Sequence, residues 1–115
     1  MDQQRTMPAV SQRQNGDPSA IPENAFLLLH GLKVVPLRQA IVNIGSGRDN
    51  DLVIDDPRVS RNHAQLRSNQ DHYVLCDQNS SAGTYVNGVR TSRSILYPGD
   101  LISLAGFALV FGQST

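Results

Sequence analysis

Residues 84–91, TYVNGVRT, carry the clearest fold signal in the chain, an Asn87-Gly88 dipeptide between Val86 and Val89. A type I′ turn needs positive φ at two successive residues, and Asn-Gly supplies it most readily. The stretch therefore predicts a β-hairpin. Further along, Pro98-Gly99 predicts a type II turn, because Pro fixes φ and Gly accepts a positive φ.

Short apolar stretches separated by turn residues lie on both sides of this hairpin. The further strands that we expect are AFLLLHG (25–31), KVVPL (33–37), AIVNIGS (40–46), DLVID (51–55), AQLRS (64–68), HYVLCD (72–77) and the pair in LISLAGFALVFG (101–112). Pro36 indicates an edge strand, because Pro cannot donate to a ladder. The residues expected to point inward in the last pair are Ile102, Leu104, Phe107, Leu109 and Phe111. With no segment of sustained helical period, the pattern of about ten short strands predicts an all-β fold, either a sandwich or a barrel.

The N-terminal residues differ in composition from the rest of the chain. Residues 1–24 are rich in Gln, Ser, Pro, Asn and Asp and show no periodicity, so we expect a flexible tail. Residues 25–112 then form one β-sandwich domain, and 113–115 its C-terminal end. Thr6 in this tail is either an incidental threonine or, when phosphorylated, a residue that docks in the domain's own site or in that of a neighbouring molecule.

The composition limits the possible partners. The 115 residues suffice for one core, and 39% are hydrophobic against 17% charged. A formal net charge of zero disfavours non-specific binding to nucleic acid, which requires an excess of basic groups. The basic residues are nine Arg and one Lys, and the Arg guanidinium suits carboxylate or phosphate, so specific anion recognition stays open.

The composition also indicates the cellular compartment of the protein. A single cysteine, Cys76, cannot form an internal disulfide, which fits a reducing compartment. No apolar run approaches the ~20 residues of a membrane helix, and no secretory signal is evident. We therefore expect a cytoplasmic protein, monomeric and without membrane contact.

Several chemical sites are disfavoured by their surroundings. The Gly-rich loop NIGSGRDND (43–51) leads into a strand and not into the helix that nucleotide loops use. Ser60 and His63 lack a nucleophile elbow and a fixed Asp. His72 and Cys76 lie four residues apart, which on a strand spans about 13 Å, too far to share a metal. We therefore expect no enzyme activity, no metal and no cofactor.

The stretch VSRNHAQL (59–66) suggests anion binding instead. In a sandwich, alternate loops collect at one end, and the loops 45–50, 56–63 and 77–83 would then bring together Arg48, Ser60, Arg61 and Ser81. Guanidinium, hydroxyl and backbone N–H donors without a carboxylate are the chemistry of phosphate capture. The residues alone equally allow Ser60 to cap a turn while both arginines are solvated.

An ordered set of motifs resembles the forkhead-associated (FHA) domain, a β-sandwich of eleven strands that binds phosphothreonine peptides. The likeness covers about residues 25–112 and runs through IGSGRDNDLVIDDPRVSRNHAQL, DQNSSAGTYVNG and LYPGDLISLAGFALVFG, in family order. It implies that Ser60 contacts phosphate, that Arg61 adds a second contact, and that His63 braces the recognition loops. Gly45, Gly83 and Asn87, by the same resemblance, are structural supports of the binding loops.

Two positions depart from the family pattern. The family usually has Arg directly after the glycine that Gly45 matches, where this chain has Ser46, and usually Asn where this chain has Ala82. We expect Arg48 to substitute for the missing arginine, and we include Ser46 among the phosphopeptide-binding residues. The nearby Asp49, Asp51, Asp55 and Asp56 could instead neutralise Arg48 or Arg58.

The resemblance therefore implies a module that binds phosphothreonine-containing proteins or peptides in a Ser/Thr kinase pathway. The alternative is a phospho-independent scaffold or assembly domain that keeps the fold and has lost the phosphate site.

Overall fold

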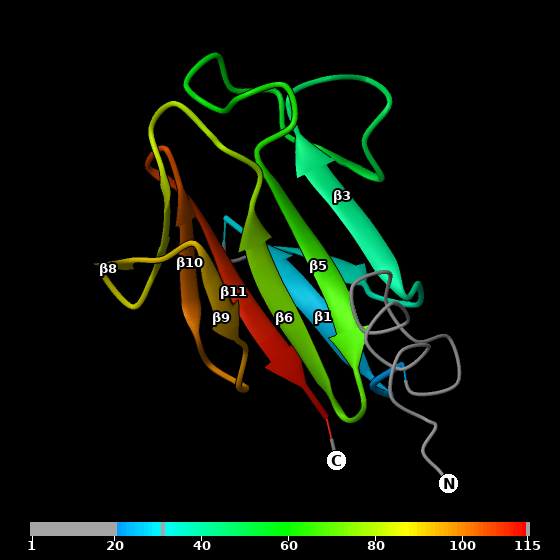
Figure 1. The fold of residues 1–115 in the computed structure, drawn as a ribbon. Coiled ribbons are helices and arrows are strands. Elements are labelled where there is room, and N and C mark those ends of the chain that lie inside the picture. Colours follow the sequence, from blue (N-terminus) through cyan, green and yellow to red (C-terminus); the bar gives the residue numbers. More distant parts are fainter. Residues whose placement is uncertain (1–20, 31, 115) are drawn as a thin grey trace, which may run out of the picture.

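The computed structural model describes residues 21–30 and 32–114, which form two β-sheets packed face to face (Figure 1). Sheet A has the strand order β2-β1-β11-β10-β7-β8, and sheet B has the order β4-β3-β5-β6-β9. Thr6 and the rest of the expected tail up to residue 20 lie outside the described residues, so the tail stays a prediction. The all-β sandwich is confirmed.

Eleven short strands make up the two sheets. Those of sheet A are β1 (Ala25–Leu29), β2 (Lys33–Pro36), β7 (Thr84–Val86), β8 (Val89–Arg90), β10 (Leu101–Leu104) and β11 (Phe107–Gln113). Those of sheet B are β3 (Ile41–Gly45), β4 (Leu52–Val53), β5 (Ala64–Asn69), β6 (His72–Asp77) and β9 (Arg93–Ile95). The strand β2, which ends at Pro36, lies at the edge of sheet A, as its proline predicts.

The turns follow the local sequence. Val86 pairs with Val89 across the turn from β7 to β8, where Asn87 and Gly88 have φ of 51° and 83°, and this hairpin prediction is confirmed. Gly99 has a φ of 94°, and the amide of Asp100 donates to the carbonyl of Tyr97, which closes the expected turn.

One pair of strands is parallel, in an otherwise antiparallel sandwich. The chain leaves β3, folds back through residues 46–51, and runs beside β3 again as β4, so that Ile44 pairs with Leu52. The carboxylate of Asp51 accepts the backbone N–H of Asn43 at 2.8 Å and so extends the edge of the strand. This short return brings the Gly-rich loop to the end of the sheet.

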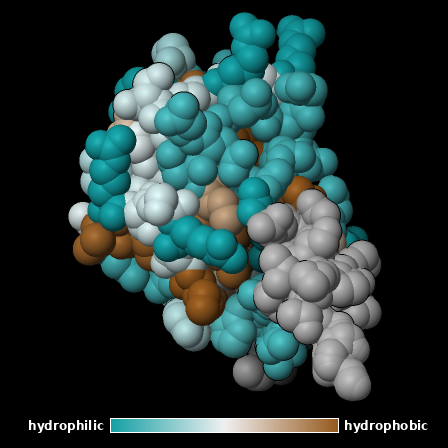
Figure 2. All heavy atoms as spheres, in the orientation of Figure 1, coloured by the Kyte–Doolittle hydropathy of each residue, from teal (hydrophilic) through white to brown (hydrophobic). Residues whose placement is uncertain are grey.

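Alternation of side chains places the core between the sheets. The buried positions include Val42 and Ile44 of β3, Leu66 of β5, and Ile102 of β10, while Phe107 is partly buried and packs against this core. The outer face of sheet B, by contrast, carries polar side chains that are linked to one another. This face is turned toward the viewer in Figure 2 and is largely hydrophilic.

Candidate functional site

Three loops meet at one end of the sandwich. They connect β3 to β4, β4 to β5 and β6 to β7, and they lie together at the upper end in Figure 1. The amide of Ser46 donates to the carbonyl of Ser60 at 3.0 Å, and the amide of Gly47 donates to the carbonyl of Arg61 at 3.1 Å. The first two loops are therefore joined through their backbones.

The close approach of these loops depends on residues with little or no side chain. A Cβ on Gly45 would stand 2.2 Å from the carbonyl oxygen of Arg61, so only glycine fits at this position. The Asn50 amide then donates to the carbonyls of both Gly47 and Arg61, at 2.8 and 2.7 Å. Sequence reasoning missed Asn50, although an Asn three residues after a turn glycine is a typical source of such local bonds.

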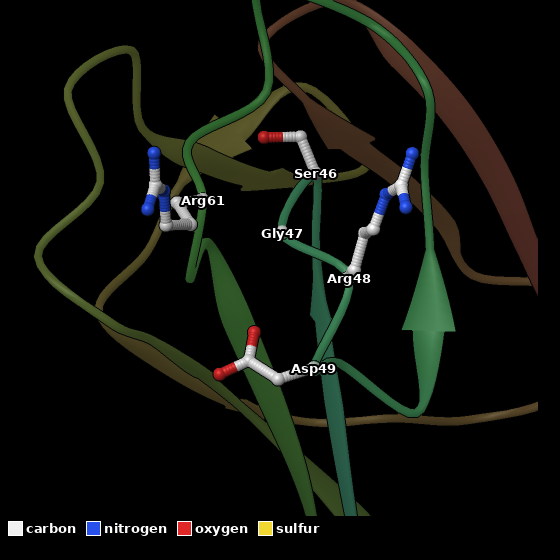
Figure 3. Close-up of a pocket in the computed structure, with 5 residues that line it drawn as sticks. All are labelled: Ser46, Gly47, Arg48, Asp49 and Arg61. Carbon is white, nitrogen blue, oxygen red and sulfur yellow. The ribbon is translucent and has the colours of Figure 1, made fainter.

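Two cationic side chains flank the joined loops. Figure 3 shows the guanidinium groups of Arg48 and Arg61 on either side of Ser46, with the carboxylate of Asp49 on the same side of the loop as Arg61. These residues line a hollow of about 550 Å³ together with Gly47. Both arginines are exposed, and neither guanidinium group makes a hydrogen bond or ion pair with a residue of 21–30 or 32–114. The local surface is therefore positive and accessible.

Two of the nearby aspartates, Asp51 and Asp56, have other partners. Asp56 forms a two-point ion pair with Arg58, with Nη2 2.7 Å from Oδ2, and the hydrogen bonds and charge of Arg58 lower the pKa of Asp56 to about 2. Asp51 accepts hydrogen bonds from Asn43 and Gln39. Arg58 is thus the arginine that an aspartate neutralises.

Ser60 stands where the second and third loops meet. Its backbone N–H donates to Nδ1 of His63 at 3.0 Å, and its hydroxyl oxygen accepts the N–H of Ser81 at 3.1 Å. Because Nδ1 of His63 accepts, Nε2 carries the hydrogen and donates to the carbonyl of Gly83 at 2.9 Å. The Ser60 hydroxyl hydrogen has no acceptor among the described residues and can be donated to an anion.

The third loop is held by a carboxylate that sequence reasoning also missed. Oδ1 of Asp77 accepts the hydroxyls of Ser80 and Thr84, at 2.5 and 2.7 Å, and Oδ2 accepts the N–H of Ser80. Burial acts to raise the pKa of Asp77, but these hydrogen bonds outweigh it and leave that pKa below its usual value. The D-x-x-S spacing is the signal from which this Asx-type turn could have been found.

Some residues that were expected in the site have other roles. The Ser46 hydroxyl donates its hydrogen to the carbonyl of Val59 at 2.9 Å, so it lines the hollow without a free donor. Ala82 is exposed and offers no side-chain amide. The side chain of Asn87 bonds to Asp100 and Leu101 and so supports the β7–β8 turn, not the three loops. Of the other expected ligands, Arg48 and Arg61 line the hollow, and Ser60 and Ser81 are joined by a hydrogen bond at the same end of the sandwich.

Two searches of the described residues bear on other kinds of site. Within residues 21–30 and 32–114 no group of three His, Cys, Asp or Glu side chains is placed to hold a metal ion. In the same ranges no helix has the length and apolar character to cross a membrane.

Comparison with known proteins identifies the family that this chain matches. A family model described as FHA domain matches residues 42–105. A sequence relative, an oxoglutarate dehydrogenase inhibitor of Corynebacterium jeikeium, is 43% identical over 65% of this chain and 52% of its own length. Another, the glycogen accumulation regulator GarA of Mycobacterium tuberculosis, is 39% identical over 65% of this chain and 46% of its own length. The chain thus matches about half the length of these curated relatives.

A solved structure agrees with these matches. It is described as a structural and functional analysis of phosphothreonine-dependent FHA domain interactions, and it superposes with a TM-score of 0.75 at 29% identity. The match covers 79% of this chain and 97% of that one. It extends the likeness from sequence to most of the described sandwich.

Proposed function

Because this chain belongs to the FHA domain family, we propose that it binds proteins phosphorylated on threonine, through the end of the sandwich where its three loops meet. In this role it docks onto targets of Ser/Thr kinases in the cytoplasm and catalyses no reaction. Two matched relatives are named as an inhibitor and as a regulator, and a matched FHA structure is described as phosphothreonine-dependent, which supports this proposal.

The observation that carries the proposal is a pair of unpaired guanidinium groups on the two loops that join at Ser60, whose hydroxyl hydrogen is free to donate. Arg48 and Arg61 have no anionic partner among the described residues, and Ser60 is held in place through its backbone N–H and its hydroxyl oxygen. A phosphate carries a charge of about −1.5 to −2 near neutral pH and needs such donors. Ser81, next to Ser60 in space, supplies a further exposed hydroxyl. In this proposal Ser46 shapes the hollow.

The direct test is a calorimetric titration of the chain with paired peptides. A pool of peptides with one phosphothreonine and varied flanking residues is compared with the same pool unphosphorylated. We expect binding only to the phosphorylated pool, weakening as salt rises and as pH falls below about 6, where phosphate loses charge. Equal binding of both pools would reject the proposal and leave a scaffold that has lost its phosphate site.

A further inference from the structure

Arg90 lies against the third loop, at Gly83. It is the second residue of β8 and pairs with Tyr85 of β7. The Nε and Cζ atoms of Arg90 are 2.8 and 3.0 Å from the point where a Cβ on Gly83 would stand. Gly83 has a φ of 92° and no side chain, so the guanidinium of Arg90 rests on the backbone of the loop.

The charge of Arg90 is not matched by its surroundings. Arg90 is exposed, and its side chain makes no hydrogen bond or ion pair with any residue of the described ranges 21–30 and 32–114. Asp77, in the same loop region, accepts hydrogen bonds from Ser80 and Thr84 instead. A guanidinium held in one place without a carboxylate is available to an anionic ligand.

The position of Arg90 relative to the phosphate site is fixed by the loop itself. Ser81 donates its N–H to the hydroxyl oxygen of Ser60, and two residues later the carbonyl of Gly83 accepts from His63. Two residues of extended chain span roughly 6.6 Å. A peptide whose phosphate meets Ser60 therefore needs only a few residues to reach the Arg90 guanidinium across the surface of this loop.

We infer that Arg90 is a specificity-determining residue that selects an acidic side chain within four residues of the phosphothreonine. The inference rests on the proposed function and adds the class of peptide that the site prefers. Arg48 and Arg61 hold the phosphate, and Arg90 reads a carboxylate beside it. Phosphothreonine peptides without such a carboxylate bind the same site less tightly.

The test uses the full chain and one parent peptide that carries phosphothreonine with four alanines on each side. Eight further peptides each replace one of these alanines with Asp. We expect at least one Asp peptide to bind about two- to fivefold tighter than the parent, the range of an exposed ion pair. Arg90→Gln should abolish this gain and leave the affinity for the parent unchanged, because the variant keeps the phosphate contacts.

Arg93→Gln is the matched control, since Arg93 is also exposed but belongs to β9 of sheet B. It should preserve the gain. The inference is overturned if no Asp position strengthens binding, or if the gain persists in Arg90→Gln. A parent peptide that binds no better than its unphosphorylated form would overturn the proposed function itself and the inference with it.

Discussion

Arg48 and Arg61 line the same hollow from two different loops, and backbone hydrogen bonds join these loops to each other. The N–H of Gly47 donates to the carbonyl of Arg61, and the side-chain amide of Asn50 donates to the carbonyls of Gly47 and Arg61. The two guanidinium groups are consequently carried by a joined pair of loops, although neither makes a hydrogen bond or ion pair with the described residues. Their effect on binding should then be large, and their effect on folding small.

Replacing either arginine with alanine is expected to weaken phosphopeptide binding by about tenfold or more, since a hydrogen bond to a charged group contributes ~1.5–3 kcal/mol. Thermal unfolding should shift little in Arg48→Ala and Arg61→Ala. Calorimetry with one phosphothreonine peptide measures the first effect, and Arg93→Ala on sheet B is the control. An unchanged affinity in Arg48→Ala would mean that Arg48 points into solvent and does not replace the arginine that the family usually has.

His63 has the opposite balance of effects, because it is fully buried and bridges two loops. His63→Ala leaves the N–H of Ser60 and the carbonyl of Gly83 without partners, and each such group costs about 1–3 kcal/mol. We expect a loss of roughly 2–5 kcal/mol in the free energy of unfolding, measured in urea, together with weaker phosphopeptide binding. His72→Ala, at the start of β6, should unfold nearly as the unmodified chain does. Similar losses in both variants would argue against the bridge.

The identities of these residues were within reach of sequence reasoning, but their bonding was not. The resemblance to the FHA domain implied a ligand-facing Ser60 and a bracing His63. The structure shows that His63 links the N–H of Ser60 to the carbonyl of Gly83. Asn50 was missed because its partners are backbone carbonyls, one of them eleven residues away. Such contacts leave no periodicity in the sequence.

Among the elements, the loop from β6 to β7 shows how a single carboxylate fixes a binding surface. Asp77 ends β6, and through Ser80 and Thr84 it holds both ends of the loop that presents Ser81 to Ser60. Glycine at position 83 then lets the chain turn with positive φ into β7. The loop is therefore ordered before any ligand arrives.

The variant Asp77→Asn tests whether Asp77 holds this loop, through the pH dependence of the free energy of unfolding. The folded pKa of Asp77 lies below its usual value of 3.8, so the carboxylate stabilises the fold above about pH 4 and loses this effect as pH falls through the folded pKa. At pH 7 we expect Asp77→Asn to lower the free energy of unfolding by about 1–3 kcal/mol. The gap from the unmodified chain should shrink at pH 3. A gap of the same size at both pH values would contradict the account, and Asp71→Asn, at an exposed turn residue, is the control.

Turn chemistry explains which hairpins could be predicted. Asn87-Gly88 was identified from its residue types, whereas the turn from β10 to β11 has the same signs of φ at Ala105 and Gly106, 53° and 88°. Alanine rarely adopts positive φ, so this hairpin was expected from the inward-facing residues on both sides of the turn and not from the residue types within it. The pairing of Leu104 with Phe107 holds it, since both strands of this hairpin lie within sheet A.

Across the whole molecule, burial pattern and turns sufficed for the sandwich, while the parallel β3–β4 pair did not follow from either. Two residue pairs, Ile44 with Leu52 and Gly45 with Val53, are too short a run to give a signal of their own. Their arrangement depends on the loop between them, which is held by contacts to the next loop. Tertiary packing, and not local preference, decides this part of the fold.

Tyr73 connects the two sheets and allows the packing of the whole sandwich to be tested. Its ring stands edge-on to Phe111 of sheet A, with centroids 6.4 Å apart, and its hydroxyl donates to the carbonyl of Gln39 at 2.6 Å. Burial raises the pKa of Tyr73 to about 12 from its usual 10. The neutral side chain therefore stabilises the fold fully below pH 10, and this contribution is lost as pH rises through 12.

Tyr73→Phe keeps the ring and removes the titrating hydroxyl, so it should lower the free energy of unfolding by about 1 kcal/mol at pH 8. Between pH 10 and 12 the unmodified chain should lose stability more steeply than this variant, because only the unmodified chain must ionise a buried phenol. Urea unfolding across this pH range, followed by circular dichroism, measures both slopes. Tyr97→Phe, at a tyrosine that is 54% exposed, should follow the unmodified chain. Parallel slopes for Tyr73→Phe and the unmodified chain would mean that water reaches the Tyr73 hydroxyl and that the sheets pack less tightly there than the structure has them.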